Sequence, residues 1–416
     1  MKNGEPTIAA LDIGSTKVVV IVGQIQEGMI QIIGVGRSQN TGLRRGTVVD
    51  IEETVSSISS ALEDAQRTSG IEIDGCFTGM SGSQITSVDS KGVIAASRAD
   101  GEIQEDDVER AIESANSVAL PANFEILHSV PKSFTVDGQN EIKDPVGLAG
   151  IRLEVTSHVI GASASAVRNL GKAVQQSGLN IDGIIFSPLA SAKAFLTKKQ
   201  KEIGVAIVDI GASSTSLAVY EEGTLLHTKV IPLGANHITN DIAIGLKISI
   251  DAAEKLKVSE VDCEIENVRE AEKIDLSKYE RGEKEKPTRL YVCEIAQARL
   301  NEIFDLVKEE LKTIERDEML PAGAILVGGG AKIKGLQPLA KKALGLPVQV
   351  GHPVFEVSGI VDKMDDPEYA TAVGLLLWGL DESHTNVSNR TKANLDFKKV
   401  SGAIDRIKEI FRNLVP

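Results

Sequence analysis

The sequence contains an internal repeat, and no other feature restricts the fold as strongly. Residues 7–36 (TIAALDIGSTKVVVIVGQIQEGMIQIIGVG) can be laid against residues 205–234 (VAIVDIGASSTSLAVYEEGTLLHTKVIPLG). In both segments a β-branched strand ends in Asp-Ile-Gly, a turn of small residues follows, and two further strands are joined by a Glu-Gly turn. The same order of strands and turns, present twice, predicts two homologous halves.

The segments outside the repeat predict helices that cover two sheets. Aromatic residues make up 3% of the chain, so Ile, Val, Leu and Ala must fill the core, as is usual for helix-covered sheets. The expected fold class is therefore α/β, with two halves around a cleft. Apolar residues at helical spacing predict helices over residues 50–69, 164–176, 189–196, 238–258 and 290–315.

Breaks in the repeat divide the chain further. Residues 83–163 have no counterpart in the second copy, and we interpret them as an inserted α+β subdomain. Residues 381–395 are polar without periodicity, which is typical of a flexible linker. The expected organisation is a first half of residues 1–82 and 164–195, the insertion of residues 83–163, a second half of residues 196–240 and 324–380, a peripheral subdomain of residues 241–323, the linker, and a terminal segment of residues 396–416.

Charge and cysteine content exclude several classes of protein. The net charge of −14 repels phosphate backbones, so we expect no binding of nucleic acid. Cys76, Cys263 and Cys293 are scattered without metal-ligand spacing, which fits a reducing, cytoplasmic compartment. No apolar run approaches the roughly 18 residues that a membrane-spanning helix requires, so we expect neither secretion nor a span.

The two Asp-Ile-Gly turns are the strongest candidates for a functional site. Bare backbone in such a turn can approach phosphate, and the carboxylates, Asp12 and Asp209, can hold hydrated Mg²⁺. Two turns that face each other across a cleft would grip a polyphosphate from both sides, although a single Asp-x-Gly turn is commonly only a hairpin. The expected phosphate-binding residues are Gly14, Ser15, Thr16 and Lys17 in the first turn and Gly211, Ser213, Ser214 and Thr215 in the second.

A run of three glycines follows the predicted buried strand at residues 324–327. Without a Cβ, the backbone of Gly328, Gly329 and Gly330 can lie flat against a planar base, and a plain strand-to-helix turn explains the same residues equally well. Neither GxGxxG at a first βα turn nor GxxxxGK[ST] occurs, so the dinucleotide and Walker folds are excluded.

Several motifs, in the expected order, resemble those of the actin-like ATPase superfamily: DIGSTK, DIGASST, AEKLK (253–257) and VGGGAKIKGL (327–336). More closely, RRGTVVDIEE (44–53), MSGSQI, DPVGLAGIRLEV, LGANHITNDIA and EYATAVGLLLWG are similar to the FtsA family of bacterial cell-division proteins. This resemblance covers nearly the whole chain. It implies a duplicated ribonuclease-H-like fold around a nucleotide cleft, with residues 83–163 as the SHS2-like insertion of that family.

The resemblance also implies a function. Members of the family bind ATP with Mg²⁺, self-assemble into filaments, and tie the FtsZ ring to the inner face of the membrane at the division site. Residues 83–163 would bind other division proteins. Asp12 and Asp209 would flank the metal, and the nucleoside pocket would be formed by Glu254, Lys257, Gly328, Gly329, Gly330 and Lys332.

Two departures from related sequences concern catalysis. Many relatives in the superfamily have Asp-x-Gly-Gly-Gly-Thr at the second turn, where this chain has Asp-Ile-Gly-Ala-Ser-Ser-Thr from Asp209, and the added Cβ atoms crowd the approach of a phosphate. Some relatives place a Glu before the Pro of the first connecting helix to orient water, whereas Ser187 precedes Pro188 here. We therefore expect the nucleotide to serve assembly, with slow hydrolysis if any.

The last 21 residues have the pattern of an amphipathic helix. Five basic and three acidic residues give residues 396–416 a charge of +2, so the rest of the chain carries −16. A basic amphipathic helix behind a linker suits an anionic membrane surface, and docking on the protein's own core is the alternative. The apolar stripe consists of Phe397, Val400, Ile404, Ile407, Phe411 and Leu414.

The segment CEIAQARLNEIFDLV is a candidate partner site. Relatives hold the acidic C-terminal tail of FtsZ near the segment CEIAQARLNEIFDLV, where Arg299, Asn301 and Lys308 would pair with it, or would simply form a solvated helix face. One alternative function is an actin-like platform protein of pilus assembly, which lacks the tethered terminal helix. The other is a small-molecule phosphotransferase, for which the first half shows no acidic base.

Overall fold

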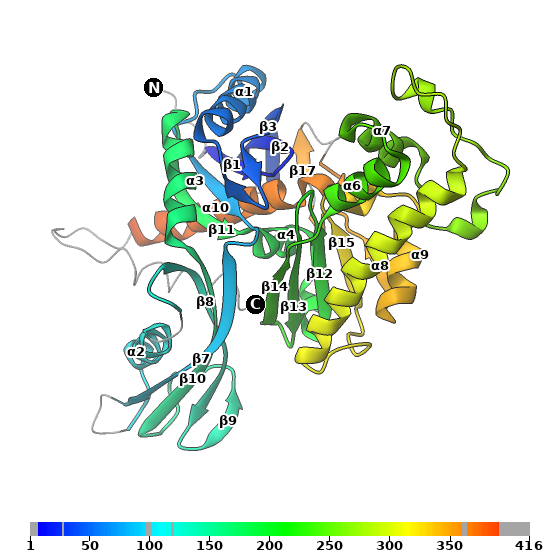
Figure 1. The fold of residues 1–416 in the computed structure, drawn as a ribbon. Helices are drawn as coiled ribbons and strands as arrows, with labels where there is room; N and C mark the ends of the chain where they lie inside the picture. Colours follow the sequence, from blue (N-terminus) through cyan, green and yellow to red (C-terminus); the bar gives the residue numbers. More distant parts are fainter. Residues whose placement is uncertain are drawn as a thin grey trace.

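The first half of the chain forms a sheet whose strands come from three separate segments. In the computed structural model, which describes residues 7–26, 29–96, 101–117, 120–355, 357–359 and 364–390, its strand order is β11-β6-β1-β2-β3-β17 (Figure 1). The strands are β1 (Thr7–Ile13), β2 (Lys17–Gln26), β3 (Met29–Gln39), β6 (Gly75–Met80), β11 (Asn180–Phe186) and β17 (Val357–Gly359).

A second sheet repeats this topology. Its strands are β12 (Val205–Ile210), β13 (Thr215–Glu221), β14 (Thr224–Ile231), β15 (Ala324–Val327) and β16 (Val348–Val350). The order β14-β13-β12-β15-β16 corresponds to β3-β2-β1-β6-β11 of the first sheet. In the first sheet, β1 pairs antiparallel with β2 and parallel with β6. In the second sheet, β12 likewise pairs antiparallel with β13 and parallel with β15. The duplicated α/β architecture expected from the repeat is therefore confirmed.

Helices α1 (Ile51–Ser69) and α3 (Ala164–Gln176) cover the first sheet, and a small hairpin of β4 (Leu43–Arg44) and β5 (Thr47–Val48) precedes α1. Local sequence explains both ends of α1. The Asp50 side chain accepts the backbone N–H of Glu53 at 3.0 Å, and Gly70 ends the helix in the left-handed conformation with φ 69°. The buried face of α1 carries Ile58 and Leu62 into the core of the sheet.

Helices α4 (Ser187–Phe195) and α10 (Ala370–Arg390) join the two halves. They cross in contact with each other, with α10 packed on β1, β2 and β6 and α4 on β12 and β13. The core around them contains side chains from both sheets, such as Ile8 and Val205. A short helix, α5 (Lys198–Ile203), follows α4 and leads into β12.

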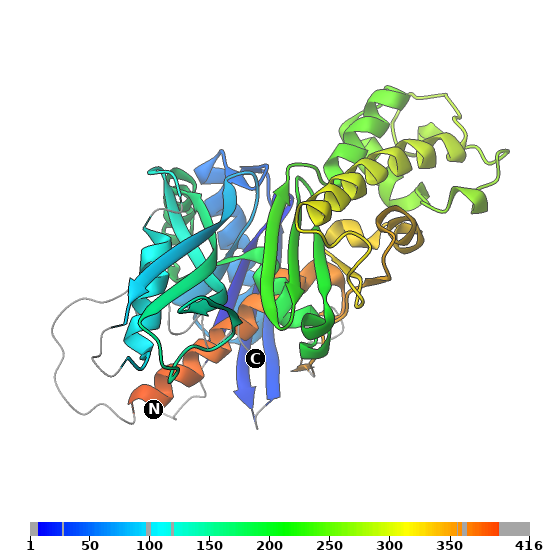
Figure 2. The same ribbon diagram turned by 90° about the horizontal axis from the view of Figure 1, so that it is seen from below.

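The periphery of the second half is helical (Figures 1 and 2). It consists of α6 (Ala235–Leu246), α7 (Ile250–Glu260), the 3₁₀ turns η1 (Ile265–Asn267) and η2 (Leu276–Lys278), α8 (Arg289–Thr313) and α9 (Leu336–Leu344). The single helix predicted over residues 238–258 is wrong, because Lys247 adopts φ 57° and Ser249 starts a new helix by accepting the N–H of Ala252. Helix α6 also runs across the boundary predicted after residue 240.

Residues 83–163 form a separate antiparallel sheet below the first half in Figure 1. Its strands are β7 (Ile85–Ala95), β8 (Phe124–Val136), β9 (Gln139–Ile142) and β10 (Arg152–Ser163), in the order β7-β10-β8-β9. Helix α2 (Glu105–Asn116) packs on this sheet over a small core of its own, which includes Ile112, Phe134 and Leu153.

Helix α10 continues past the point where the sequence predicted a flexible linker. Residues 381–390 extend the helix to Arg390, so the linker boundary at 381 is wrong. The sequence DESHTNVSNR contains neither Gly nor Pro to stop a helix, and two contacts hold its first turn: Asp381 pairs with Lys193, and the Trp378 indole N–H donates to Glu382 at 3.1 Å. The predicted amphipathic segment 396–416 lies outside the described residues. Among the described helices, none combines the length and the apolar character needed to cross a membrane.

Candidate functional site

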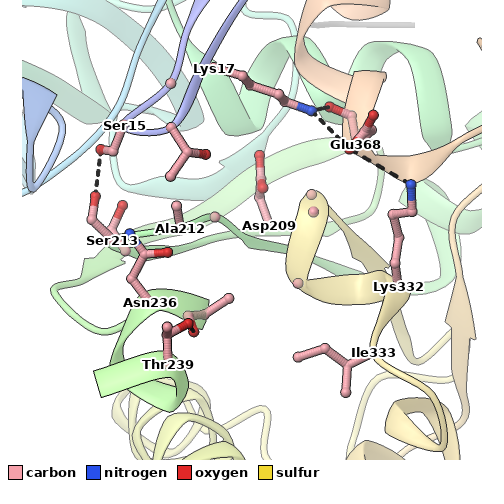
Figure 3. A pocket seen from close by; sticks show the side chains of 18 of the residues that line it. Ser15, Lys17, Asp209, Ala212, Ser213, Asn236, Thr239, Lys332, Ile333 and Glu368 are labelled. Carbon is pink, nitrogen blue, oxygen red and sulfur yellow. Dashed lines mark hydrogen bonds and ion pairs between the residues drawn. The ribbon is translucent and has the colours of Figure 1, made fainter. Parts of the chain in front are cut away.

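A cleft of about 790 Å³ separates the two halves. Its walls come from the strand ends and turns of both sheets, from α6 and α7, and from the segment that leads into α10. This volume lies in the range of roughly 300–1,000 Å³ that is typical of small-molecule sites. Figure 3 shows that Ser15 and Lys17 approach from the first half, and Asp209, Ser213, Asn236 and Thr239 from the second.

The two Asp-Ile-Gly turns face each other across this cleft. The Gly14 N–H donates to the Lys17 carbonyl at 2.8 Å, and the Gly211 N–H donates to the Ser214 carbonyl at 2.9 Å, so both turns close in the same way. The hydroxyls of Ser15 and Ser213 lie 2.7 Å apart. The sequence-predicted residues of the two turns are thus brought together, and backbone and hydroxyl groups of both halves line one space that suits a phosphate chain.

One predicted phosphate residue does not belong to this lining. Thr215 is fully buried, and its hydroxyl donates to the Leu233 carbonyl at 2.8 Å. Neighbouring residues on a strand point to opposite faces, so Ser216 reaches the cleft while Thr215 points into the second half. The assignment of the Thr215 side chain to phosphate binding is therefore wrong.

Asp12 and Asp209 lie at the end of equivalent strands, β1 and β12, and both line the cleft. Burial raises the pKa of Asp12 to about 6, against the opposing effect of Lys17. Burial also raises the pKa of Asp209 to about 6, and the charge of Asp12 adds to the rise. The Thr371 hydroxyl donates to Asp209 at 3.4 Å, which is a long contact. The protein therefore supplies too little positive charge and too few hydrogen bonds to offset the burial of these two carboxylates.

The chemistry of this pair fits a hydrated Mg²⁺ ion. Among the described residues there is no group of three or more His, Cys, Asp or Glu side chains that would hold a metal ion by themselves. Mg²⁺ keeps several of its waters and commonly uses one or two protein carboxylates together with phosphate oxygens. Two partly buried carboxylates beside a phosphate-sized space are the donor set that such an ion requires.

The three glycines after β15 serve two different purposes. They lead into the 3₁₀ turn η3 (Gly329–Lys332), and Gly328 has φ 84°. A Cβ on Gly328 would overlap Asp209, and one on Gly330 would overlap Ile210. A Cβ on Gly329 would meet no atom within 4 Å, so only this glycine faces open space in the cleft. The contact with a flat ligand that the sequence predicted for the whole run is thus restricted to Gly329.

Glu254 and Lys257 on α7 also line the cleft, in different roles. The Lys257 side chain is 8% exposed, and its ammonium donates to Thr239 Oγ1 at 2.9 Å, Glu254 Oε2 at 2.7 Å and the Ala235 carbonyl at 3.3 Å. Thr239 donates to the same Glu254 oxygen at 2.5 Å. Lys257 therefore links α7 to α6 through hydrogen bonds and has a structural role. The half-exposed Glu254 side chain can reach a ligand.

A cluster of charges stands at the edge of the cleft (Figure 3). Glu368, in the 3₁₀ turn η4 (Pro367–Tyr369), pairs with Lys17 at 3.3 Å, Arg37 at 3.0 Å and Lys332 at 3.7 Å. Lys17 and Lys332 were predicted from the sequence, whereas Arg37, Glu368, Asn236 and Thr239 also line the cleft and were not. Asn236 and Thr239 lie in the recognised motif LGANHITNDIA, and Glu368 begins the motif EYATAVGLLLWG, so these motifs could have identified them. Arg37 lies in no recognised motif.

Ser187 is the first residue of α4, directly before Pro188, and it lines the cleft. It offers a hydroxyl where a carboxylate would orient water. On the second turn, Ala212, Ser213 and Ser214 line the cleft, so their Cβ atoms stand where glycines would leave more room for a phosphate.

The predicted peptide residues on α8 do not form one surface. Successive residues of a helix are rotated by ~100°, so Asn301 and Lys308 lie nearly opposite Arg299. Arg299 faces α6 and donates to both oxygens of Asp241, at 2.7 and 3.0 Å. Lys308 pairs with Glu318 at 2.6 Å. The grouping of all three residues in one site is therefore wrong.

Comparison with known proteins agrees with this architecture. The family model for cell division protein FtsA matches residues 206–374, and the model for the SHS2 domain inserted in FtsA matches residues 82–161. The FtsA of Pseudomonas aeruginosa is 36% identical over 92% of this chain and 91% of its own length. The FtsA of Bacillus subtilis is 38% identical over 90% of this chain and 83% of its own length.

Solved structures support the fold alone. A structure of the PilM-PilN type IV pilus biogenesis complex has a TM-score of 0.67 at 19% identity and covers 91% of this chain and 99% of that one. MreB5 of Spiroplasma citri bound to ADP has a TM-score of 0.55 at 14% identity, covering 92% and 98%. These similarities confirm the actin-like fold with its SHS2 insertion. The pilus-assembly alternative is not favoured, because the sequence identity to FtsA proteins is about twice as high. The chain belongs to the FtsA family of cell-division proteins.

Proposed function

We propose that this protein binds ATP with Mg²⁺, polymerises, and tethers the FtsZ ring to the cytoplasmic face of the membrane through residues 396–416. The two facing Asp-Ile-Gly turns carry the nucleotide part of this proposal, since the Ser15 and Ser213 hydroxyls lie 2.7 Å apart beside two partly buried carboxylates. A protein of the same fold, MreB5 of Spiroplasma citri, has been solved with ADP bound. The cytoplasmic side fits the three free, scattered cysteines.

The phosphates of the nucleotide lie between the two turns. Gly14 and Ser15 hold them from the first half, and Gly211 and Ser213 from the second, with Lys17 as the cation. Asp12 and Asp209 hold the hydrated Mg²⁺. When bound, this ion would neutralise part of the charge of the phosphates.

The base lies over Gly329, at the open position of the glycine run. Apolar side chains of Ile250, Val258 and Ile333 line the same region of the cleft. Glu254 and Lys332 supply polar contacts to the nucleoside, and Lys257 supports Glu254 from below. Ser187 offers no carboxylate to orient a water molecule, so hydrolysis is slow and the nucleotide acts as an assembly ligand.

Replacing Gly329 with leucine tests the nucleotide site directly. No protein atom lies within 4 Å of the added Cβ, so the side chain should extend into the cleft without disturbing the fold. We expect Gly329→Leu to weaken ATP binding at least about tenfold, measured by isothermal titration calorimetry. Binding of inorganic tripolyphosphate, which has no base, should not change. Equal ATP affinities of the two proteins would reject this position for the base.

The tail of FtsZ binds beside Arg299, where α6 and α8 pack against each other. Ile244 on α6 and Tyr291 on α8 are 75% and 44% exposed, and Tyr291 lies two helical turns before Arg299 on the same face. An extended peptide with apolar and acidic residues can use both kinds of contact. A peptide carboxylate would share the Arg299 guanidinium with Asp241.

Membrane attachment and assembly depend on each other. A single short amphipathic helix binds lipid weakly and reversibly, so stable attachment requires many copies held in one filament. The inserted subdomain binds further division proteins. Its exposed apolar side chains, Val146, Leu148 and Ile151, are 42%, 40% and 72% exposed near one end of the subdomain and suit a partner surface.

A further inference from the structure

Glu368 stands where three cations meet at the edge of the cleft. Its carboxylate lies 3.3 Å from the Lys17 ammonium, 3.0 Å from the Arg37 guanidinium and 3.7 Å from the Lys332 ammonium. The Glu368 side chain is 12% exposed, whereas those of Arg37 and Lys332 are 53% and 46% exposed. Figure 3 shows Glu368 between Lys17 and Lys332. One carboxylate thus serves cations from both halves of the molecule.

Backbone contacts hold this carboxylate in place. The Glu368 N–H donates to Asp366 at 3.0 Å, and the Lys17 ammonium donates to the Glu368 carbonyl at 3.0 Å. The preceding residue, Pro367, accepts the N–H of Gly328 at 2.9 Å, which ties η4 to the glycine run. Asp366 also pairs with Lys332. Glu368 is therefore positioned by the fold and is not a freely moving surface side chain.

Lys17 depends on this partner. The Lys17 side chain is 17% exposed, and its ammonium also lies 5.0 Å from the centre of the Tyr369 ring. Burial lowers the pKa of Lys17, and Glu368 makes the largest opposing contribution, ahead of Asp12. A lysine in this position offers one ammonium to both Glu368 and an incoming phosphate. Because carboxylate and phosphate are both anions, they repel each other at such close range.

We propose that Glu368 is a built-in competitor for the phosphate groups of the ligand. It holds Lys17 in the nucleotide-free protein, and when phosphate takes Lys17 it keeps only Arg37 and Lys332. This inference rests on the nucleotide site proposed above and adds how its affinity is limited. The competitor acts on ligands that carry phosphate at Lys17. It has little effect on adenosine, which carries none, because Asp366 is the nearer partner of Lys332.

The test compares Glu368→Gln with a matched variant, Asp365→Asn, by calorimetric titration. Asp365 is 72% exposed, faces His352 at 3.1 Å and does not line the cleft, so its replacement removes one negative charge near the cluster without touching it. We expect Glu368→Gln to bind ATP and ADP about three- to fivefold more tightly, the upper part of the range for one ion pair. Adenosine affinity should stay unchanged, and Asp365→Asn should change every affinity less than about twofold.

A second background identifies the group through which Glu368 acts. In Lys17→Met the gain from Glu368→Gln should disappear, because the contested cation is gone. Glu368→Ala serves as the second variant if Glu368→Gln unfolds at lower temperature than the wild type. ATP binding that is unchanged or weaker in the Glu368 variants would overturn the proposal, and so would a gain that persists in Lys17→Met or appears equally for adenosine. A wild-type protein that binds no nucleotide would instead defeat the proposed function itself.

Discussion

Asp209 is a carboxylate whose ionisation opposes folding in the absence of a cation. Its pKa is about 6 in the folded protein, above the ordinary value of 3.8, because it is buried and faces Asp12. A raised folded-state pKa means that the unfavourable contribution is absent below about pH 4 and fully present above about pH 6. The same argument applies to Asp12. A proton would therefore compete with the proposed Mg²⁺ ion for this pair as the pH falls through 6.

Asp209→Asn should consequently stabilise the protein at neutral pH. We expect the free energy of unfolding of the variant to exceed that of the wild type by on the order of 1–3 kcal/mol at pH 7.5, and by little at pH 4. Urea unfolding from pH 4 to 8, without divalent cations or nucleotide, measures the difference. A difference that does not grow with pH would show that Asp209 does not titrate in this range.

Arg299 offers a second test at a single side chain. Arg299→Glu reverses the charge where α8 faces α6, and we expect it to weaken binding of an FtsZ tail peptide at least about tenfold in fluorescence anisotropy. Arg316→Glu is the matched control, because Arg316 forms a comparable pair with Glu221 through contacts of 2.8–3.1 Å on another surface. Equal losses in both variants would assign the effect to stability or net charge.

The crossing of α4 and α10 fixes how closely the two halves approach. A Cβ on Gly374 of α10 would overlap the Ala190 carbonyl of α4, so only glycine permits this contact. We expect Gly374→Ala to lower the free energy of unfolding by about 1–3 kcal/mol, because the helices must separate. Gly171→Ala in α3 is the control: its Cβ meets only Ile181 at 4.0 Å, and the change should stabilise by about 0.5–1 kcal/mol. Chemical unfolding that ranks the two in the opposite order would contradict this reading of the crossing.

The proposed membrane attachment is tested on the full chain, in which a terminal segment of charge +2 follows a body of charge −16. Truncation after Arg390 leaves every described helix intact, including the whole of α10. We expect the full chain to sediment with vesicles that contain anionic lipid, and more strongly with ATP if assembly adds the contributions of many tails. The truncated protein should stay in the supernatant. Equal sedimentation of both proteins would show that residues 396–416 are not required for membrane binding.

Local patterns in the sequence were sufficient to predict the duplicated sheets, the ends of α1 and α3, and the two turns that carry Asp12 and Asp209. These features depend on hydrogen bonds and apolar spacing between residues close in the chain, so a short window contains the information. A short window did not predict which face of β13 each side chain takes, and Thr215 points away from the cleft. The linker was predicted to begin at residue 381, which is too early, because side-chain contacts such as Lys193 with Asp381 hold the extension of α10.

Tertiary contacts alone brought together the charges that govern the cleft. Lys17 and Glu368 are 351 residues apart in the chain, and Arg299 finds Asp241 across 58 residues. No periodicity or motif links such residues, because their encounter depends on how two sheets, two crossing helices and the peripheral helices pack. The same packing buries Lys257 and leaves Gly329 open. Sequence supplied the chemical groups at this site, and the packing of the two halves set which of them meet.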